Sequence, residues 1–365
     1  MKKTIFVLLI IFIFCFLFCG MAEGAESPLS DLAGAVPGDA GRLMENVDVT
    51  KDGGFQDGLL SLLSAGRDEV ASVIRGSVKS VAALLFVVML SNIAEGMYEN
   101  GKDSKLPRFS QLVGALAVVT LAAGSLTELI GLGGETIEEM DQLSKVLLPT
   151  LAAATAASGS VAAAAVREVA TSFFADVLIN CINGILVPLL YLYLGAATAD
   201  AVLKNKSLGR LAEVIKKFIM WSLTALVSAF TAYLTISGAL ASSADNLSVR
   251  AARLALSGGV PVVGSILSDA AGSLLAGAAI LKNSVGAFGT LAVFAICIAP
   301  FIRLGIQYIL FKFASFLAST IDATSLAALI DKLGGAFGLI LGMTGATAFL
   351  LIISIISSVS AVSYG

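Results

Sequence analysis

The sequence predicts an all-α polytopic membrane protein with about six to eight spans. Hydrophobic residues make up 57% of its 365 positions and charged residues only 13%, whereas a soluble globular domain carries about 25% charge. Several apolar runs are long enough to cross a bilayer, and lysine and arginine gather in some of the segments between them. Other segments are weakly hydrophobic and rich in small residues, which is typical of re-entrant or closely packed helices.

Composition also limits the kinds of function. The chain has no histidine, and its four cysteines have no metal-ligand spacing, so the usual metal ligand and the usual neutral-pH base are missing. The formal net charge is −3 and no sustained basic tract occurs, which gives no support for nucleic-acid binding. We expect no cofactor, no metal and no catalytic residue, and we expect membrane lipid as a partner.

Residues 1–25 predict a secretory signal peptide. Two lysines precede an apolar run from Ile5 to Phe18, and small residues that suit cleavage follow. An uncleaved anchor is one alternative. A lipoprotein signal that ends at Cys19 is another, which the bulky ring of Phe18 disfavours.

Residues 26–79 predict an exported N-terminal segment. It is polar and broken by proline and glycine, apart from an amphipathic helix expected from Phe55 to Ile74. The segment is too short to bury much core of its own. The apolar face of this helix is therefore expected to lie on the membrane or on a partner.

The polytopic domain is predicted over residues 80–365, and its first spans are assigned from flanking charge. The runs Ser80–Tyr98 and Gln111–Leu132 flank a loop with three basic residues, which marks that loop as cytoplasmic. The acidic residues from Glu135 to Asp141 are then expected to form an outer loop.

The next segments are assigned in the same way. Val146–Val166 is rich in alanine and is not expected to cross, because the single crossing Ala170–Ala197 separates the acidic loop from the basic stretch Lys204–Lys217. This basic stretch is predicted to lie along the inner surface as a helix. Its apolar face would carry Leu208, Leu211, Ile215 and Phe218.

Three apolar runs complete the domain. Phe218–Ala241 is the next span, and Ala336–Val362 is the last, which ends near the cytoplasm under this count. Between them, Ser284–Thr320 is interpreted as two spans with a tight turn near Arg303. One broken helix is the alternative, because Pro300 and two cations interrupt the run.

The stretch from Ser257 to Lys282 is the candidate functional segment. A helix is predicted to begin near Pro261, and small or polar residues recur every fourth position on one of its faces. Such a face lets another helix approach closely or lines a path for water and solute, and Asp269 is its one formal charge. The candidate packing or path-lining residues, together with the later arginine, are Gly264, Ser268, Asp269, Gly272, Gly277 and Arg303.

An internal echo links two blocks, residues 146–218 and 245–313. Each contains a Ser-Gly pair, then a small-residue segment and an apolar run, and each ends at a similar motif, IKKF (Ile215–Phe218) or LFKF (Leu310–Phe313). Both blocks are expected to enter from the same side, which predicts a parallel repeat of the kind that transport proteins use. Chance similarity among few residue types is the alternative.

A resemblance to a known family is carried by three segments. They are Thr235–Ala270 (TISGALASSADNLSVRAARLALSGGVPVVGSILSDA), Leu281–Gly289 (LKNSVGAFG) and, more loosely, Leu151–Ala165 (LAAATAASGSVAAAA). With the overall layout, they resemble the stage III sporulation protein AE family of endospore-forming bacteria. The first two motifs are specific, and the rest of the chain agrees mainly in hydropathy.

The resemblance implies a multi-pass protein of the mother-cell membrane around the developing forespore. It also implies partners, the other stage III A proteins and the forespore protein Q, in a channel or secretion-like complex that supports forespore development. No catalytic or ligand residue is carried over by the resemblance.

Three hypotheses about function are weighed on these observations. The first is a channel or export component with the small-residue face at a path or subunit seam. The second is a non-conducting scaffold that docks ring-forming and ATPase partners. The third, a membrane enzyme, is disfavoured by the missing histidine and the lack of a recognised nucleophile motif.

Overall fold

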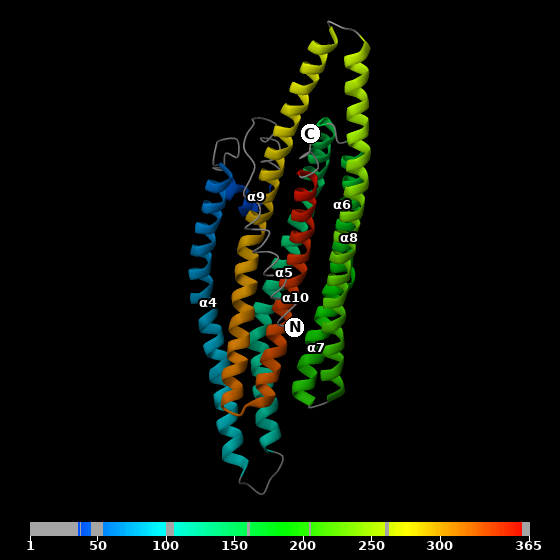
Figure 1. The fold of residues 1–365 in the computed structure, drawn as a ribbon. Coiled ribbons are helices and arrows are strands. Elements are labelled where there is room, and N and C mark those ends of the chain that lie inside the picture. Colours follow the sequence, from blue (N-terminus) through cyan, green and yellow to red (C-terminus); the bar gives the residue numbers. More distant parts are fainter. Residues whose placement is uncertain are drawn as a thin grey trace.

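The computed structural model is an elongated bundle of long helices that run alternately up and down (Figure 1). The predicted signal peptide and most of residues 26–53 lie outside the described residues. In 237–259 and 263–278 the backbone is described, and the side chains are not. The structure describes residues 36, 38–44, 54–99, 106–158, 161–203, 206–259 and 263–359.

Every regular element in these ranges is helical, in keeping with the need of a membrane-buried backbone to satisfy its own hydrogen bonds. The elements are α3 (Gly38–Met44), α4 (Gly54–Glu99), α5 (Leu106–Ala157), α6 (Val161–Cys181), the π-helix η1 (Ile182–Leu186), α7 (Val187–Leu203), α8 (Lys206–Gly259), α9 (Val263–Thr320) and α10 (Thr324–Val359).

Six helical stretches among the described residues are long and apolar enough to cross a membrane, which confirms the predicted all-α polytopic class. Their bounds are Gly54–Met97, Ser110–Ala157, Ala164–Leu203, Ser207–Ile236, Ala279–Thr320 and Thr324–Val359.

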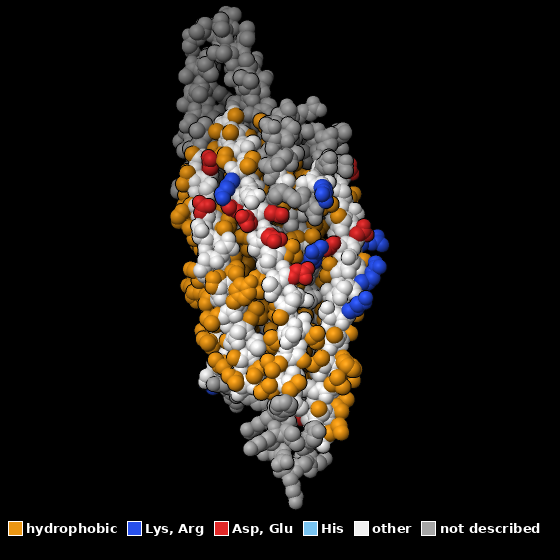
Figure 2. Space-filling model, turned by 180° about the vertical axis from the view of Figure 1, so that it is seen from behind, with side chains coloured by type: hydrophobic (Ala, Val, Ile, Leu, Met, Phe, Trp, Pro, Cys, Tyr) orange, Lys and Arg blue, Asp and Glu red, His pale blue; other side chains and the backbone are white. Residues whose placement is uncertain are grey.

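The α9–α10 hairpin is the centre of the bundle. Every residue of α9 from Ser284 to Cys297 is buried, and most of α10 is buried as well. Helices α4 and α5 pack against α9, while α5 to α8 pack against α10. In the other four spans only 17–39% of the most apolar stretch is buried inside the bundle, as expected of helices that face lipid. Hydrophobic side chains accordingly spread over the lower part of the face shown in Figure 2.

A tight turn joins α9 to α10 and is tied to a third helix. Asp322 has a φ of 63°, a left-handed conformation that aspartate adopts more readily than most residues. The amide of Ala323 donates to the carbonyl of Ala318 at 3.2 Å, so the end of α9 is capped. The side-chain amide of Asn92 in α4 donates to the carbonyl of Ile321 at 2.6 Å.

The prediction of two spans with a turn near Arg303 is wrong, because α9 is one continuous helix. Pro300 lies inside it and removes only one backbone donor. Arg303 does not require a turn of the chain, since its side chain, which is 43% exposed, is paired with Glu69 of α4, as described below. Consequently α10 ends at the opposite end of the bundle from the connection between α7 and α8 (Figure 1). The prediction had placed the end of the last span and the basic stretch Lys204–Lys217 on the same, cytoplasmic side.

The predicted outer loop from Glu135 to Asp141 is also wrong in form, because it lies within α5. Its glutamates, methionine and leucines are good helix formers, and Gly133 just before it packs against Ile340 of α10. At 1.5 Å per residue, Glu135 lies about 40 Å along the helix from Arg108, more than the roughly 30 Å of a hydrocarbon core. A helix can thus carry these acids past one membrane face.

The basic stretch begins α8 instead of lying along a surface. Lys206 is the first residue of α8, which continues to Gly259 and packs beside α6 and α7. The predicted apolar face is not the buried one, because Leu211 and Phe218 are 43% and 46% exposed. Of the predicted face only Ile215 is buried, and packing against two neighbouring helices buries Ala212 and Ile219 with it.

Three helix connections share one end of the bundle, which we call the basic end (Figure 1). Helices α4, α7 and α9 end there, and α5, α8 and α10 begin there. At the opposite end, α8 and α9 run on past the other helices. The alanine-rich segment Val146–Val166 lies at that opposite end, where it closes α5 and opens α6.

The shared basic end predicts a labelling pattern. In a chain whose four cysteines are replaced by serine, single cysteines at Lys206 and Thr324 should both react with an impermeant thiol reagent only after lysis, because basic loops stay in the cytoplasm. Glu138→Cys should react in intact cells. Labelling of Thr324→Cys in intact cells would contradict the single α9 helix and would instead support two spans within Ser284–Thr320.

Close approach of α9 and α10 predicts a steric effect at Gly334. A Cβ there would lie 2.9 Å from the Cβ of Phe311, whereas a Cβ at Gly305 has nothing within 4 Å. Gly334→Ala should lower the free energy of unfolding by about 1–3 kcal/mol through overpacking, and Gly305→Ala should leave it unchanged or raise it by up to about 1 kcal/mol. Thermal unfolding in detergent measures both, and equal midpoints would contradict the close approach.

Candidate functional site

Charged side chains inside the apolar helices gather where α7, α8, α9 and α10 lie side by side near the basic end. All of them lie within stretches that qualify as membrane spans. A charge at the centre of a bilayer costs about 2.5–3.5 kcal/mol even by insertion scales, so charges at such places need partners and mark function. We name this group the ionic cluster, and it consists of Asp200, Lys216, Lys312, Asp331 and Lys332.

Two neighbouring residues of α10 bind two different helices. The ammonium of Lys312 in α9 forms an ion pair with the carboxylate of Asp331 and donates to its main-chain oxygen at 3.1 Å. The next residue, Lys332, forms an ion pair with Asp200 of α7. Because consecutive residues of a helix point about 100° apart, this Asp-Lys pair ties α10 to α9 on one side and to α7 on another.

Tyr193 adds a hydrogen bond between α7 and α10. Its side chain is buried, and its hydroxyl donates to the main-chain oxygen of Lys332 at 2.6 Å. A Cβ at Gly335 would lie 2.9 Å from this hydroxyl and equally near the Nζ of Lys216. The glycine therefore leaves room for two polar groups beside the backbone of α10.

Lys216 differs from the other lysines of the ionic cluster. Within the described residues it forms no ion pair, whereas Lys312 and Lys332 each have a carboxylate partner. The cluster thus holds three lysines and two aspartates. Its Asp200 and Lys332 side chains are 23% and 21% exposed, so this ion pair is not sealed inside the bundle.

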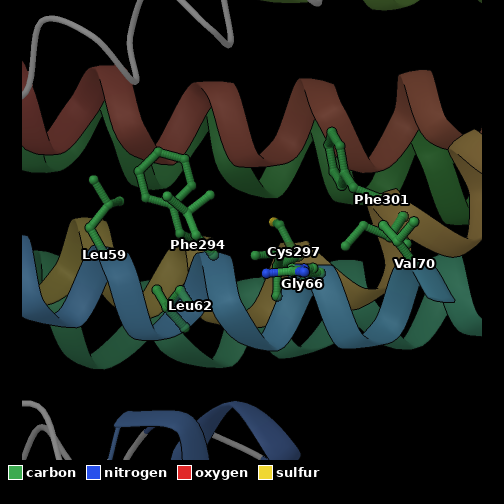
Figure 3. A pocket seen from close by; sticks show the side chains of 11 residues that line it. Leu59, Leu62, Gly66, Val70, Phe294, Cys297 and Phe301 are labelled. Carbon is green, nitrogen blue, oxygen red and sulfur yellow. The ribbon is translucent and has the colours of Figure 1, made fainter. Parts of the chain in front are cut away.

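A second polar contact, separate from the ionic cluster, lies farther from the basic end of α9. The Nε of Arg303 donates to a carboxylate oxygen of Glu69 in α4 at 2.6 Å. One turn before Arg303 the same two helices enclose an apolar pocket of about 360 Å³ (Figure 3). Its lining includes Leu59, Leu62, Gly66 and Val70 of α4 and Phe294, Cys297, Ile298 and Phe301 of α9.

Arg303 is the one sequence-predicted site residue whose side chain the structure describes, and it faces another helix within the protein. It is not brought together with the predicted small-residue face, since Gly277 lies about 39 Å away along the same helix. The remaining candidates fall in the helical part of α9 where side chains lie outside the described residues, and they are Gly264, Ser268, Asp269, Gly272 and Gly277.

The ionic cluster was not predicted as a site from the sequence, although two of its residues belong to motifs that the sequence analysis noted. Lys216 is the first of the two lysines in IKKF, and Lys312 is the lysine of LFKF. The lysine that the two motifs share in register is Lys217, and the motifs predicted a repeat and not a contact. Asp200, Asp331 and Lys332 carry only one signal, a formal charge close to the end of a long apolar run. Such a charge is ordinarily placed at the membrane interface.

The described residues contain no group of three or more histidine, cysteine or acidic side chains that could hold a metal ion. Chemically, the ionic cluster ties α10 to α9 and to α7 through two ion pairs. It adds the ammonium of Lys216 from α8, which forms no ion pair within the described residues but lies in the field of Asp331, Glu213 and Lys312. The cluster thus places several charged groups in an apolar setting.

Comparison with known proteins finds related sequences along nearly the whole chain. A family model described as Stage III sporulation protein AE matches residues 42–362. The stage III sporulation protein AE of Bacillus subtilis (strain 168) is 23% identical over 308 residues, which cover 84% of this chain and 73% of that protein. No solved structure matches the chain. The family match includes all six candidate spans and the whole ionic cluster.

Charge reversal tests the ionic cluster. Asp200→Lys and Lys332→Asp should each lower the free energy of unfolding by about 2–3 kcal/mol, because each places two like charges between apolar helices. The double variant should recover most of the loss, since the pair is restored in reverse. Thermal unfolding in detergent provides the measurement.

The exposed pair of Lys145 and Asp141 in α5 supplies the control for this experiment, and Lys145→Gln should change stability by no more than about 0.5 kcal/mol. If the double variant were no more stable than the two single ones, Asp200 and Lys332 would not interact as described.

Proposed function

The chain belongs to the stage III sporulation protein AE family, and from that premise we propose that it is a membrane component of the sporulation complex joining mother cell and forespore. The complex is proposed to be a channel or secretion-like assembly that supports forespore development. Its proposed place is the mother-cell membrane around the forespore. The proposed partners are the other stage III A proteins and the forespore protein Q.

One observation carries this proposal, the extent of the family match. It runs from residue 42 to residue 362 and so includes every candidate span, both polar contacts of α9 and the helices that run past the bundle. The sequence similarity therefore extends over the whole membrane domain and is not confined to one module. A role in sporulation follows from the family, and the family is one of membrane components, so we propose no enzymatic activity.

The ionic cluster supports a conducting role. Charged residues within membrane helices are expensive, and they usually mark paths for ions or protons. Lys216 lies between α8 and α10 and forms no ion pair within the described residues, although Asp331 and Glu213 act on it electrostatically. It is the group that we propose a passing anion would meet. The small-residue face with Gly264, Ser268 and Gly272 remains our proposal for a helix seam or a path wall.

The alternative is a non-conducting scaffold that docks ring-forming and ATPase partners, and the packing of the centre favours it. From Ser284 to Cys297 every residue of α9 is buried against its neighbours, and the pocket beside it is apolar. A path through the middle of one copy would have to displace this packing. Helices α8 and α9, which run past the bundle, are the proposed docking element.

A vesicle experiment separates the two roles. The purified chain, assembled with its stage III A partners in vesicles that hold a small fluorescent anion, should release the dye if the complex conducts. Lys216→Gln should then slow release while the complex stays assembled, because the charge that meets the anion is gone.

The neighbouring substitution Lys217→Gln is the matched control, since Lys217 is exposed on α8 and lies outside the ionic cluster. An assembled complex without release would refute the conducting role and leave the scaffold. Spore yield in strains carrying the same two variants would show whether the cluster matters in the cell.

A further inference from the structure

We propose that the apolar pocket between α4 and α9 holds one acyl chain of an anionic phospholipid, with the lipid phosphate against Arg67. The proposal concerns the membrane around the chain. It goes beyond the complex proposed above and does not depend on it.

The shape of the pocket suits a linear apolar chain. On α4 its lining runs from Leu59 to Val70, which is about 16 Å at 1.5 Å per residue, and on α9 it runs from Phe294 to Ile302. Figure 3 shows these side chains in the space between the two helices. A volume of about 360 Å³ spread over this length is narrow and extended, and not compact.

The chemistry of the lining excludes a polar occupant in the interior of the pocket. Apart from Arg67, every lining residue is an aliphatic or aromatic side chain, a glycine or a cysteine. The thiol of Cys297 is already directed to the sulfur of Met140 at 3.6 Å. With no further side-chain hydrogen-bonding groups, the pocket holds water poorly and favours hydrocarbon.

Arg67 supplies the one charge at the pocket. It is exposed and forms no ion pair within the described part of the chain. Beside it on the same helix, Leu60 and Leu63 are 63% and 45% exposed, and Ser64 and Asp68 are exposed as well, so this cation stands where apolar and polar surface meet. A guanidinium binds phosphate in bidentate geometry, and a cation with apolar neighbours suits the boundary between lipid head group and acyl chain.

The nearby ion pair favours an anion at Arg67. Glu69 would otherwise compete for the guanidinium or repel a phosphate, but its carboxylate is bound by Arg303 at 2.6 Å. Asp68 points about 100° away from Arg67 around the helix. A phospholipid joins a linear apolar chain to an anionic phosphate, and it is also the solvent of a six-span membrane protein.

Photo-crosslinking to the purified full-length chain tests the proposal. The probes are phosphatidylglycerol and phosphatidylcholine that carry a diazirine in one acyl chain. Phosphatidylglycerol should label peptides that contain residues 59–70 or 294–302, about tenfold more strongly than phosphatidylcholine at equal concentration. Adducts that map only to other helices would overturn the proposal.

Two variants separate head group from chain. Arg67→Gln should reduce phosphatidylglycerol labelling to the phosphatidylcholine level, whereas Arg75→Gln, on the same helix but outside the pocket lining, should leave it unchanged. Gly66→Leu should reduce labelling by both lipids at these peptides, because even a Cβ there would lie 2.9 Å from the Cδ1 of Ile298.

Unfolding midpoints show whether the Gly66→Leu protein is folded. If it is not folded, the ratio of phosphatidylglycerol labelling to phosphatidylcholine labelling in Arg67→Gln is the deciding measurement. A ratio unchanged by Arg67→Gln, or labelling unchanged in a folded Gly66→Leu protein, would show that the pocket does not hold a phospholipid in this way.

Discussion

One ion pair, between Glu69 of α4 and Arg303 of α9, allows the central helix to run unbroken through the bundle. A cation within a long apolar run is costly unless it reaches the interface or meets a counter-charge. Here α4 brings the carboxylate to it, 2.6 Å from Nε. The run need not turn at Arg303, and its single course brings Lys312 opposite Asp331 in α10. The number of crossings, the direction of α10 and the ionic cluster all depend on this continuity.

The class of the fold could be predicted from the sequence because it depends on composition and on local runs. Apolar stretches long enough to span, and basic residues between them, suffice for an all-α polytopic protein with its basic connections at one end. Partners distant in sequence could not be predicted. Glu69 and Arg303 are 234 positions apart, and no local pattern shows that one will neutralise the other. The acidic residues from Glu135 to Asp141 were wrongly predicted as a loop. They lie within α5, which is longer than a bilayer is thick and can carry charged residues beyond the membrane face.

The candidate site was predicted in a different part of α9 from the one where described side chains converge. Small residues repeated every fourth position form a visible pattern, whereas isolated charges such as Asp200 and Asp331 do not. The IKKF and LFKF motifs contain Lys216 and Lys312 of the cluster, but the lysine that matches Lys312 in register is Lys217, which is exposed on α8. The two blocks take different courses, because the first includes the connection between α7 and α8 and the second runs down α9. The matched lysines thus have different surroundings, because Lys312 is paired with Asp331 and Lys217 is exposed.

The 58 residues of α9 form a rod about 87 Å long, nearly three times the thickness of a hydrocarbon core. Near one of its ends the rod is held by the ionic cluster, and near the other it projects past the bundle together with α8. Such a rod is too long for its two ends to lie in one bilayer. The charges near the basic end and the part of α9 that projects past the bundle therefore belong to one unbroken helix, which packing and the Arg303–Glu69 ion pair hold in place between them.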